Sequence, residues 1–256
     1  MRRRIQGEAN MPLLEHLNVL RKVLLISAYA IAIGAVAGFF LSDPLYAWLA
    51  LPAINADVAE FVTTTPMEPM MVKLQLSIVI GIVVALPVLL WQIWSFILPA
   101  LKQNEKKSVY TVVPSSLVLF IVGIAFCYFF VLPIGIKFLL TAGSGSVATK
   151  ILLTKSSYLK FILTFLLSFG VVFQLPVVLL VLIRLGVITP QTLAKFRKYA
   201  FFIIIVLAMV ISPTPDLTTQ ALMAGPMYLL YEASIWLGYL VAKRRTKALA
   251  AKEAGK

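Results

Sequence analysis

Six apolar segments set the strongest limit on what this chain can fold into. They cover residues 22–41, 71–97, 109–132, 157–183, 199–212 and 217–241, and residues typical of turns lie between them. A helix needs about 20 apolar residues to cross the hydrocarbon core of a bilayer. Of the 256 residues, 61% are hydrophobic, whereas soluble domains contain about 45–50%. The sequence therefore predicts an all-α integral membrane protein with six transmembrane helices.

The fifth and sixth segments are expected to be short or irregular spans. A helix over residues 199–211 would rise only about 20 Å, and the sixth segment is interrupted at Gly225-Pro226. We therefore expect the bilayer to thin, or these helices to tilt. Pro87 and Pro176 lie inside the second and fourth segments, where each removes a backbone donor and can kink its helix.

Basic residues are distributed unevenly between the two sides of the predicted bundle. One side, which includes both chain ends, carries 18 of the 23 lysines and arginines. The positive-inside rule places this side in the cytoplasm, so we predict a multi-pass protein of the cytoplasmic (inner) membrane with both termini cytoplasmic. Trp91 and Trp94 are expected at the same interface. The net charge of +13 thus indicates orientation in a bilayer, and no nucleic-acid partner is expected.

The chain divides into three predicted parts. Residues 1–21 form a cytoplasmic segment with leucines at helical spacing, which predicts an amphipathic helix on the inner surface or, equally, an inward extension of the first span. Residues 22–241 form the membrane domain, whose first span is expected to end at Asp43-Pro44. Residues 242–256 form a basic cytoplasmic tail.

Residues for catalysis or metal binding are scarce. The single histidine, His16, and the single cysteine, Cys127, lie far apart in the sequence, so no metal-ligand set is visible. No serine lies in a nucleophile motif, and no glycine-rich phosphate loop is present. The sequence therefore favours binding over bond-making, and we expect no enzyme activity and no cofactor.

Three polar residues could have either a structural or a functional role. Glu105, among lysines in the first cytoplasmic loop, is a solvated charge or receives a guanidinium from a partner. Glu232, inside the last segment, pairs with an interfacial Lys or Arg or faces a cavity or partner. Gln174, beside Pro176, bonds backbone or a neighbouring helix at the kink, or marks a groove where another transmembrane helix docks.

Eight blocks follow one another along residues 13–240. They read HLNVLRK (16–22), PMEPM (66–70), PVLLWQIWSFILPAL (87–101) followed by Glu105, FIVGIAFCYFFVLP (120–133), FGVVFQLPVVLLVLIRLGVIT (169–189), FRKYAF (196–201), SPTPDLTTQ (212–220) and PMYLLYE (226–232). In order and spacing they resemble the TatC family, the largest membrane subunit of the twin-arginine protein translocase. The resemblance implies a cup-shaped bundle of six helices that acts as receptor for signal peptides with paired arginines on folded cargo. It also implies partners of the TatA/TatB type with a single span, self-association, use of the protonmotive force, and no cofactor.

The resemblance and the polar or kinked positions described above together give the expected site residues. Signal-peptide binding is expected at Glu105, Glu15, Arg21 and Gln92. Contacts with partner helices or with the groove are expected at Gln174, Pro176, Glu68, Asp216, Gln220 and Glu232.

Two residues depart from the family pattern. Val19 stands where a second signal-binding glutamate is expected, and Glu15 lies one helical turn earlier on the same face. We expect Glu15 to supply the missing carboxylate, with looser recognition as the alternative. Gln174 stands where many members carry glutamate, so its contact should be a hydrogen bond that does not titrate.

A small-solute secondary transporter is the alternative function. Transporters also use broken helices with polar residues in mid-span. However, the interrupted spans do not recur in corresponding halves, and acids within the spans are few. A membrane enzyme ranks third, because no catalytic constellation is present.

Overall fold

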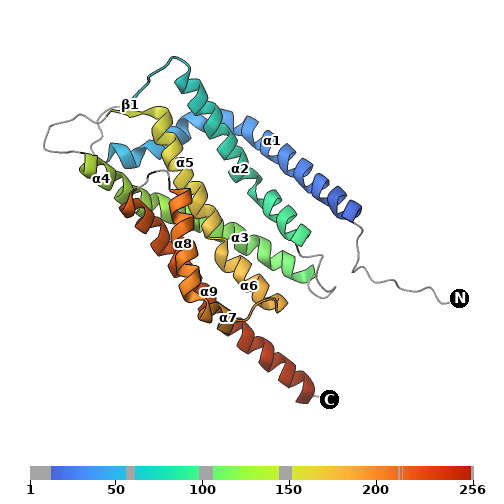
Figure 1. The fold of residues 1–256 in the computed structure, drawn as a ribbon. Coiled ribbons are helices and arrows are strands. Elements are labelled where there is room, and N and C mark those ends of the chain that lie inside the picture. The colour runs from blue at the N-terminus through green and yellow to red at the C-terminus, as the bar shows by residue number, and fades with distance from the viewer. Residues whose placement is uncertain are drawn as a thin grey trace. The chain divides into compact units, whose positions relative to one another are not determined.

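The computed structural model is helical over nearly all the residues that it describes, which are 13–55, 61–97, 106–143, 152–212, 214 and 216–254 (Figure 1). At residues 13–17, 96–97, 106–110, 140–143 and 244–254 the backbone alone is described. The helices are α1 (Leu13–Ile54), α2 (Glu68–Ile97), α3 (Lys106–Phe126), the π-helix η3 (Cys127–Val131), α4 (Leu132–Gly143), α5 (Lys155–Val172), α6 (Leu175–Leu185), α7 (Pro190–Lys195), α8 (Arg197–Ile211) and α9 (Leu217–Ala254). Two short strands, β1 (Phe61–Val62) and β2 (Leu153–Thr154), pair in parallel.

The all-α membrane fold is confirmed. Within the described residues, four helical stretches are long and apolar enough to cross a membrane, over 18–54, 68–95, 111–139 and 155–185. The fifth and sixth predicted segments form α8 and α9. Helix α8 has only 15 residues and would rise about 22 Å. The count of six spans stays a prediction for these two helices.

Two expected helix boundaries were wrong. Helix α1 continues through Asp43-Pro44 to Ile54, and α9 continues through Gly225-Pro226. Proline is tolerated within membrane helices where nearby side chains bond freed backbone groups. Near Pro44, the Ser42 hydroxyl donates to the Phe39 carbonyl at 2.7 Å, one residue before the Phe40 carbonyl that proline leaves without its usual donor. Helix α1 also begins at Leu13 without a break, which corresponds to an inward extension of the first span.

Pro176 lies next to a break between two helices, whereas the sequence predicted a kink within one helix. Helix α5 ends at Val172 and α6 begins at Leu175, with Pro176 buried in the first turn of α6. The missing N–H of proline costs nothing in a first turn, where donors have no intrahelical partner. By contrast, Pro87 lies inside the continuous helix α2.

The chain forms two compact units, which are described separately. Unit 1 comprises residues 1–44 and 73–117. In it α1 packs closely against α2, because a Cβ built on Gly34 would lie 2.8 Å from the Gly81 carbonyl oxygen, and one on Gly38 2.7 Å from that of Ser77. At its end α2 is fixed to α3 by a hydrogen bond from Trp94 Nε1 to Ser116 Oγ, at 3.0 Å.

Unit 2 comprises residues 45–72 and 118–256. Its core contains Leu159, Ile162, Phe165 and Phe169 of α5, and Cys127, which is fully buried as a packing residue was expected to be. Helices α6, α7 and α8 all pack on α9. The sheet formed by β1 and β2, with two residues in each strand, joins the segment before α2 to the segment before α5.

Candidate functional site

The residues expected to bind a signal peptide belong to unit 1. The side chains of Glu15 and Glu105 lie outside the described residues. Arg21 is exposed on α1, and Gln92 is half-buried on α2. Because Gly34 faces Gly81 and Gly38 faces Ser77, continuing this antiparallel register places Arg21 level with Trp94, within one turn of Gln92. These two predicted site residues therefore share one end of the α1–α2 pair.

Positions 15 and 19 lie one turn apart on the same helix. Helix α1 starts at Leu13 and includes both, so the geometry required for Glu15 to replace a carboxylate at Val19 is present in the backbone. The Val19 side chain is 39% exposed. Of the two tryptophans expected at the membrane interface, Trp91 is exposed, whereas Trp94 is buried and its indole N–H donates to Ser116.

Glu68 is a buried structural acceptor. One carboxylate oxygen, Oε2, accepts from the backbone N–H and the hydroxyl of Thr64, at 2.7 and 3.0 Å. The other, Oε1, accepts from the backbone N–H of Ser156 at 2.9 Å, in the first turn of α5. A carboxylate is favoured at a helix N-terminus, where the first N–H groups lack partners. Glu68 thus joins the segment before α2 to the start of α5, and contact with a partner helix at this position stays a prediction.

Asp216 caps the start of α9. Its Oδ2 accepts from the backbone N–H of Thr219 at 2.7 Å and from the hydroxyl of Thr219, which is fully buried. Burial raises the pKa of Asp216, but hydrogen bonds from the neighbouring threonines outweigh it, so that the pKa lies below its usual value. Asp216 therefore fixes the entry of the chain into α9.

An apolar groove of about 530 Å³ runs between α8 and α9. Gln220 and Tyr228 bring the polar groups to a lining otherwise made of apolar and small residues, which are Phe201, Ile205, Ala208, Leu217, Ala221, Ala224, Gly225 and Leu229. A second hollow of about 380 Å³ lies on the last residue of α3, on η3, α4 and α9, and Ala221 lines both hollows. Small residues allow a second helix to approach closely in a bilayer.

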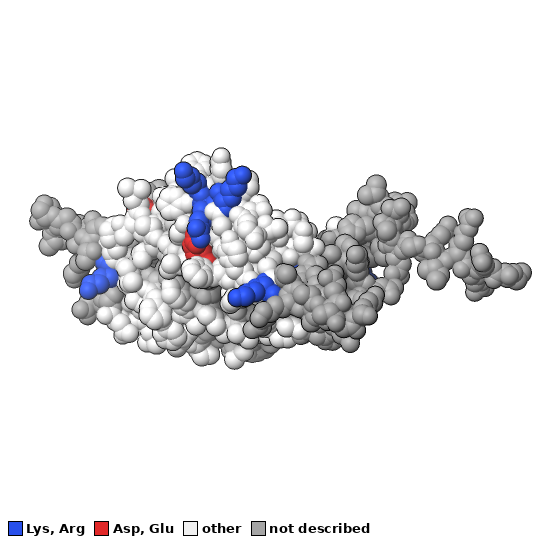
Figure 2. Space-filling model, turned by 90° about the horizontal axis from the view of Figure 1, so that it is seen from below, with Lys and Arg blue, Asp and Glu red and all other residues white. Residues whose placement is uncertain are grey.

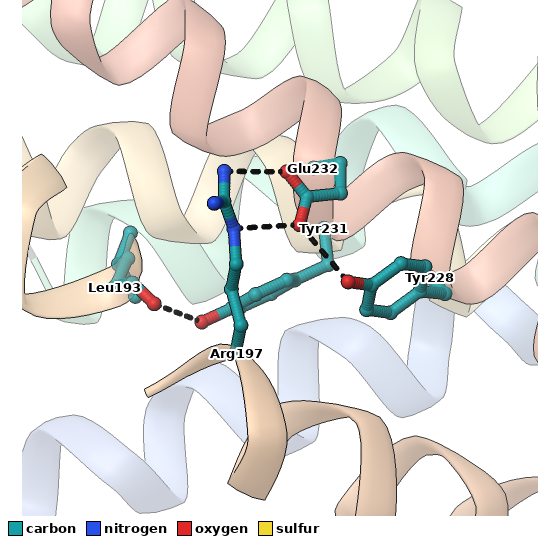
Figure 3. A network of polar contacts seen from close by, with 5 residues as sticks. All are labelled: Leu193, Arg197, Tyr228, Tyr231 and Glu232. Carbon is teal, nitrogen blue, oxygen red and sulfur yellow. Dashed lines mark hydrogen bonds and ion pairs between the residues drawn. The ribbon is translucent and has the colours of Figure 1, made fainter. Parts of the chain in front are cut away.

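Glu232 pairs with Arg197 at the end of this groove (Figure 3). Arg197 Nε and Nη2 lie 2.8 and 2.9 Å from the two carboxylate oxygens, a bidentate pair. The hydroxyl of Tyr228 donates to Oε1 at 3.1 Å, and that of Tyr231 donates to the Leu193 carbonyl at 2.9 Å. Of the two roles that the sequence left open for Glu232, the structure contains the pair with an interfacial arginine.

Gln174 lies in the break between α5 and α6. Its backbone N–H donates to Val171 and its carbonyl accepts from Val178, at 2.9 and 3.0 Å. Its side chain makes no N-cap hydrogen bond to α6. The two structural roles that the sequence left open, bonding freed backbone at the kink or bonding a neighbouring helix, stay predictions. The side chain is half-buried, and docking of a partner at this position stays a prediction.

The structure therefore brings the predicted residues together only in part. Gln220 and Glu232 lie along one α8–α9 groove, with Asp216 at its start, whereas Glu68 belongs to the β1–β2 region. Tyr228 and Arg197 were not predicted from the sequence as partners of Glu232. The four-residue spacing of Tyr228 and Glu232 on a helix is a signal that could have indicated their contact.

Comparisons with known proteins agree on one family. Residues 15–226 match the family model described as Sec-independent protein translocase protein (TatC). The chain is 40% identical to the Sec-independent protein translocase protein TatC of Aquifex aeolicus (strain VF5), with 92% of this chain and 98% of that protein covered. It is 36% identical to the Sec-independent protein translocase protein TatCy of Bacillus subtilis (strain 168), with 94% of each covered. The fold is similar to a crystal structure of the twin-arginine translocase receptor TatC, with a TM-score of 0.79, 40% identity, and 89% of this chain and 99% of that chain covered.

Proposed function

The chain belongs to the TatC family, and on this basis we propose that it recognises twin-arginine signal peptides and, with partners of the TatA/TatB type, exports folded proteins across the cytoplasmic membrane. The observation that carries the proposal is the similarity over nearly the whole chain to a translocase receptor of known structure. The protonmotive force supplies the energy, and both termini lie in the cytoplasm. The similar proteins are translocase subunits, and the transporter alternative finds no support among them.

The first step is capture of the signal peptide at the basic end of unit 1. Glu105 lies in the connection from α2 to α3. This connection follows the end of α2 that carries Gln92, and that end of α2 lies level with Arg21. Its neighbours Lys106 and Lys107 repel cations in general. A guanidinium can offset this repulsion with two parallel hydrogen bonds to one carboxylate, which an ammonium cannot form. Glu105 and Glu15 thus select paired arginines by geometry rather than by net charge.

The second step is assembly with partner helices at unit 2. The α8–α9 groove offers small residues for close approach and the Gln220 amide for an interhelical hydrogen bond. Gln174 offers a second amide at the break between α5 and α6. Neither amide titrates near neutral pH, so these contacts persist as the proton gradient changes.

The short helix α8 thins the bilayer beside this groove. The thinner bilayer lowers the free-energy barrier for a folded cargo protein to cross the membrane. The rise of α8, about 22 Å, is some 8 Å less than the hydrocarbon core. Spin labels at Met209 and Ala221 should report reduced depth; normal thickness there would reject the idea.

Export in cells that lack their own receptor tests the function. The full chain, expressed with TatA/TatB-type partners, should export a folded reporter that carries an Arg-Arg signal and retain one that carries Lys-Lys. Glu105→Gln should abolish crosslinking of the Arg-Arg signal, whereas Glu105→Asp, which keeps a carboxylate, should retain part of it. Absence of export, together with equal binding of both signals, would overturn the proposal.

A further inference from the structure

Several basic residues and one acidic residue lie around the turn from α6 through α7 into α8. Exposed cations lie at the end of α6, at the end of α7, at the start of α8 and on α9; they are Arg184, Lys195, Arg197, Lys198 and Lys243. In residues 175–211 and 217–243, Glu232 is the only acidic residue. Figure 2 shows basic side chains gathered beside an acidic one on a face whose described part is otherwise largely uncharged.

Glu232 does not neutralise the lysines of this cluster. Both of its carboxylate oxygens are engaged by the Arg197 guanidinium. Among the residues whose side chains are described, no carboxylate forms an ion pair with Lys195 or Lys198. Meanwhile Tyr231 holds the α7 backbone through Leu193, so the short helix that carries Lys195 is fixed to α9. Lys195 therefore lies on a helix that is fixed to α9, and Lys198 lies at the start of the next helix, α8.

Lys198 stands at the head of a lipid-facing stripe. On the same face of α8 follow Phe202, Val206 and Met209, which are 68%, 42% and 55% exposed. In a membrane protein an uncovered apolar helix face contacts acyl chains. Tyr199, 66% exposed next to Lys198, has the amphipathic ring typical of the interface. The lysines thus lie where acyl chains give way to headgroups.

We propose that Lys195 and Lys198 bind the phosphate of an anionic phospholipid whose acyl chains lie along α8. The lysines supply the charge that attracts an anionic headgroup, and the stripe from Phe202 to Met209 supplies the surface for its chains. A free phosphate would gain only the first of these contacts. The site is independent of signal-peptide recognition, since neither lysine belongs to the residues assigned to that step.

Brominated lipids test the site in the full-length protein. A bimane label at Gln191→Cys on α7, in a Cys127→Ala background, reports quenching by brominated phosphatidylglycerol or brominated phosphatidylcholine in nanodiscs of the same overall composition. A lysine near a membrane surface changes lipid affinity roughly 5-fold, so the preference for phosphatidylglycerol should be up to about 25-fold. It should fall close to unity in Lys195→Gln/Lys198→Gln and return in Lys195→Arg/Lys198→Arg.

The matched control removes two lysines from the other end of unit 2. Lys155→Gln/Lys160→Gln takes away the same charge at the start of α5 and should leave the preference unchanged. Soluble glycerol phosphate at millimolar concentration should not compete. Equal quenching by the two lipids, an equal loss in the control variant, or displacement by glycerol phosphate would each overturn the proposal.

Discussion

Replacing Gly81 by alanine should force α1 and α2 apart and weaken signal-peptide capture. A Cβ at this position would lie 2.6 Å from the Ala35 nitrogen, 2.7 Å from the Ile31 carbonyl oxygen and 2.9 Å from the Ala35 Cα. Nonbonded carbon contacts are optimal at about 3.5–4.0 Å, so the helices must separate by about 0.6–0.9 Å to bring these contacts to the lower end of that range. All three atoms belong to the backbone and cannot rotate away.

The expected cost is a net loss of about 2 kcal/mol in the free energy of unfolding. Overpacking of this kind costs about 1–3 kcal/mol, and the rigid backbone contacts place Gly81→Ala at the upper end. Alanine recovers about 1 kcal/mol because it favours the helix more than glycine does. The separation also displaces Arg21 relative to Gln92. In Gly81→Ala, crosslinking of an Arg-Arg signal peptide at position 105 should therefore decrease together with the free energy of unfolding.

Gly135→Ala is the matched control. No atom lies within 4 Å of a Cβ built at Gly135, so only the helix-propensity gain applies and stability should stay equal or rise by up to about 1 kcal/mol. Reversible unfolding by SDS in bicelles measures both variants. If Gly81→Ala and Gly135→Ala were equally stable, the close α1–α2 contact and its role in signal-peptide capture would be refuted.

Three further results are expected. A double-mutant cycle on Arg197→Ala and Glu232→Ala should give a coupling free energy of about 1 kcal/mol, because both side chains are partly exposed; additive losses would contradict the pair. The pKa of Asp216 is lower in the folded state, so its stabilising effect is complete above about pH 4 and is lost as pH falls further; Asp216→Asn should flatten the acid limb of the unfolding profile, and an unchanged limb would count against the cap. Glu15→Ala should reduce signal-peptide crosslinking and Val19→Glu should increase it, whereas unchanged binding in both would reject compensation by Glu15.

Features that depend on local apolar content were predictable. The lengths of the apolar segments predicted an integral membrane protein, and the short rise of α8 followed from its residue count. Proline was harder to interpret, since Pro176 lies in the first turn of a new helix whereas Pro87 and Pro226 lie inside continuous ones. Whether a proline breaks a membrane helix depends on neighbouring groups that bond the freed backbone, and these groups are not visible in a linear pattern.

Pairings between distant segments were the features that the sequence could not supply. Glu232 could be assigned an interfacial partner in general terms, but the choice of Arg197, 35 positions away, depends on how α8 packs on α9. The role of Glu68 likewise required the position of Ser156, and the two strands are too short to produce an alternating pattern. A family resemblance can place such residues near a site without giving their partners.

The Glu68–Ser156 bond has a consequence for how the protein is made. The two residues are separated by 88 positions, and β1 must likewise wait for β2. At a synthesis rate of roughly 5–20 residues per second, Glu68 leaves the ribosome about 4–18 s before Ser156, whose backbone N–H is its donor. During that interval the nascent chain holds one carboxylate oxygen, Oε1 of Glu68, and a strand edge whose partners do not yet exist. This region is therefore finished late in biogenesis, although half of it is encoded in the first third of the chain.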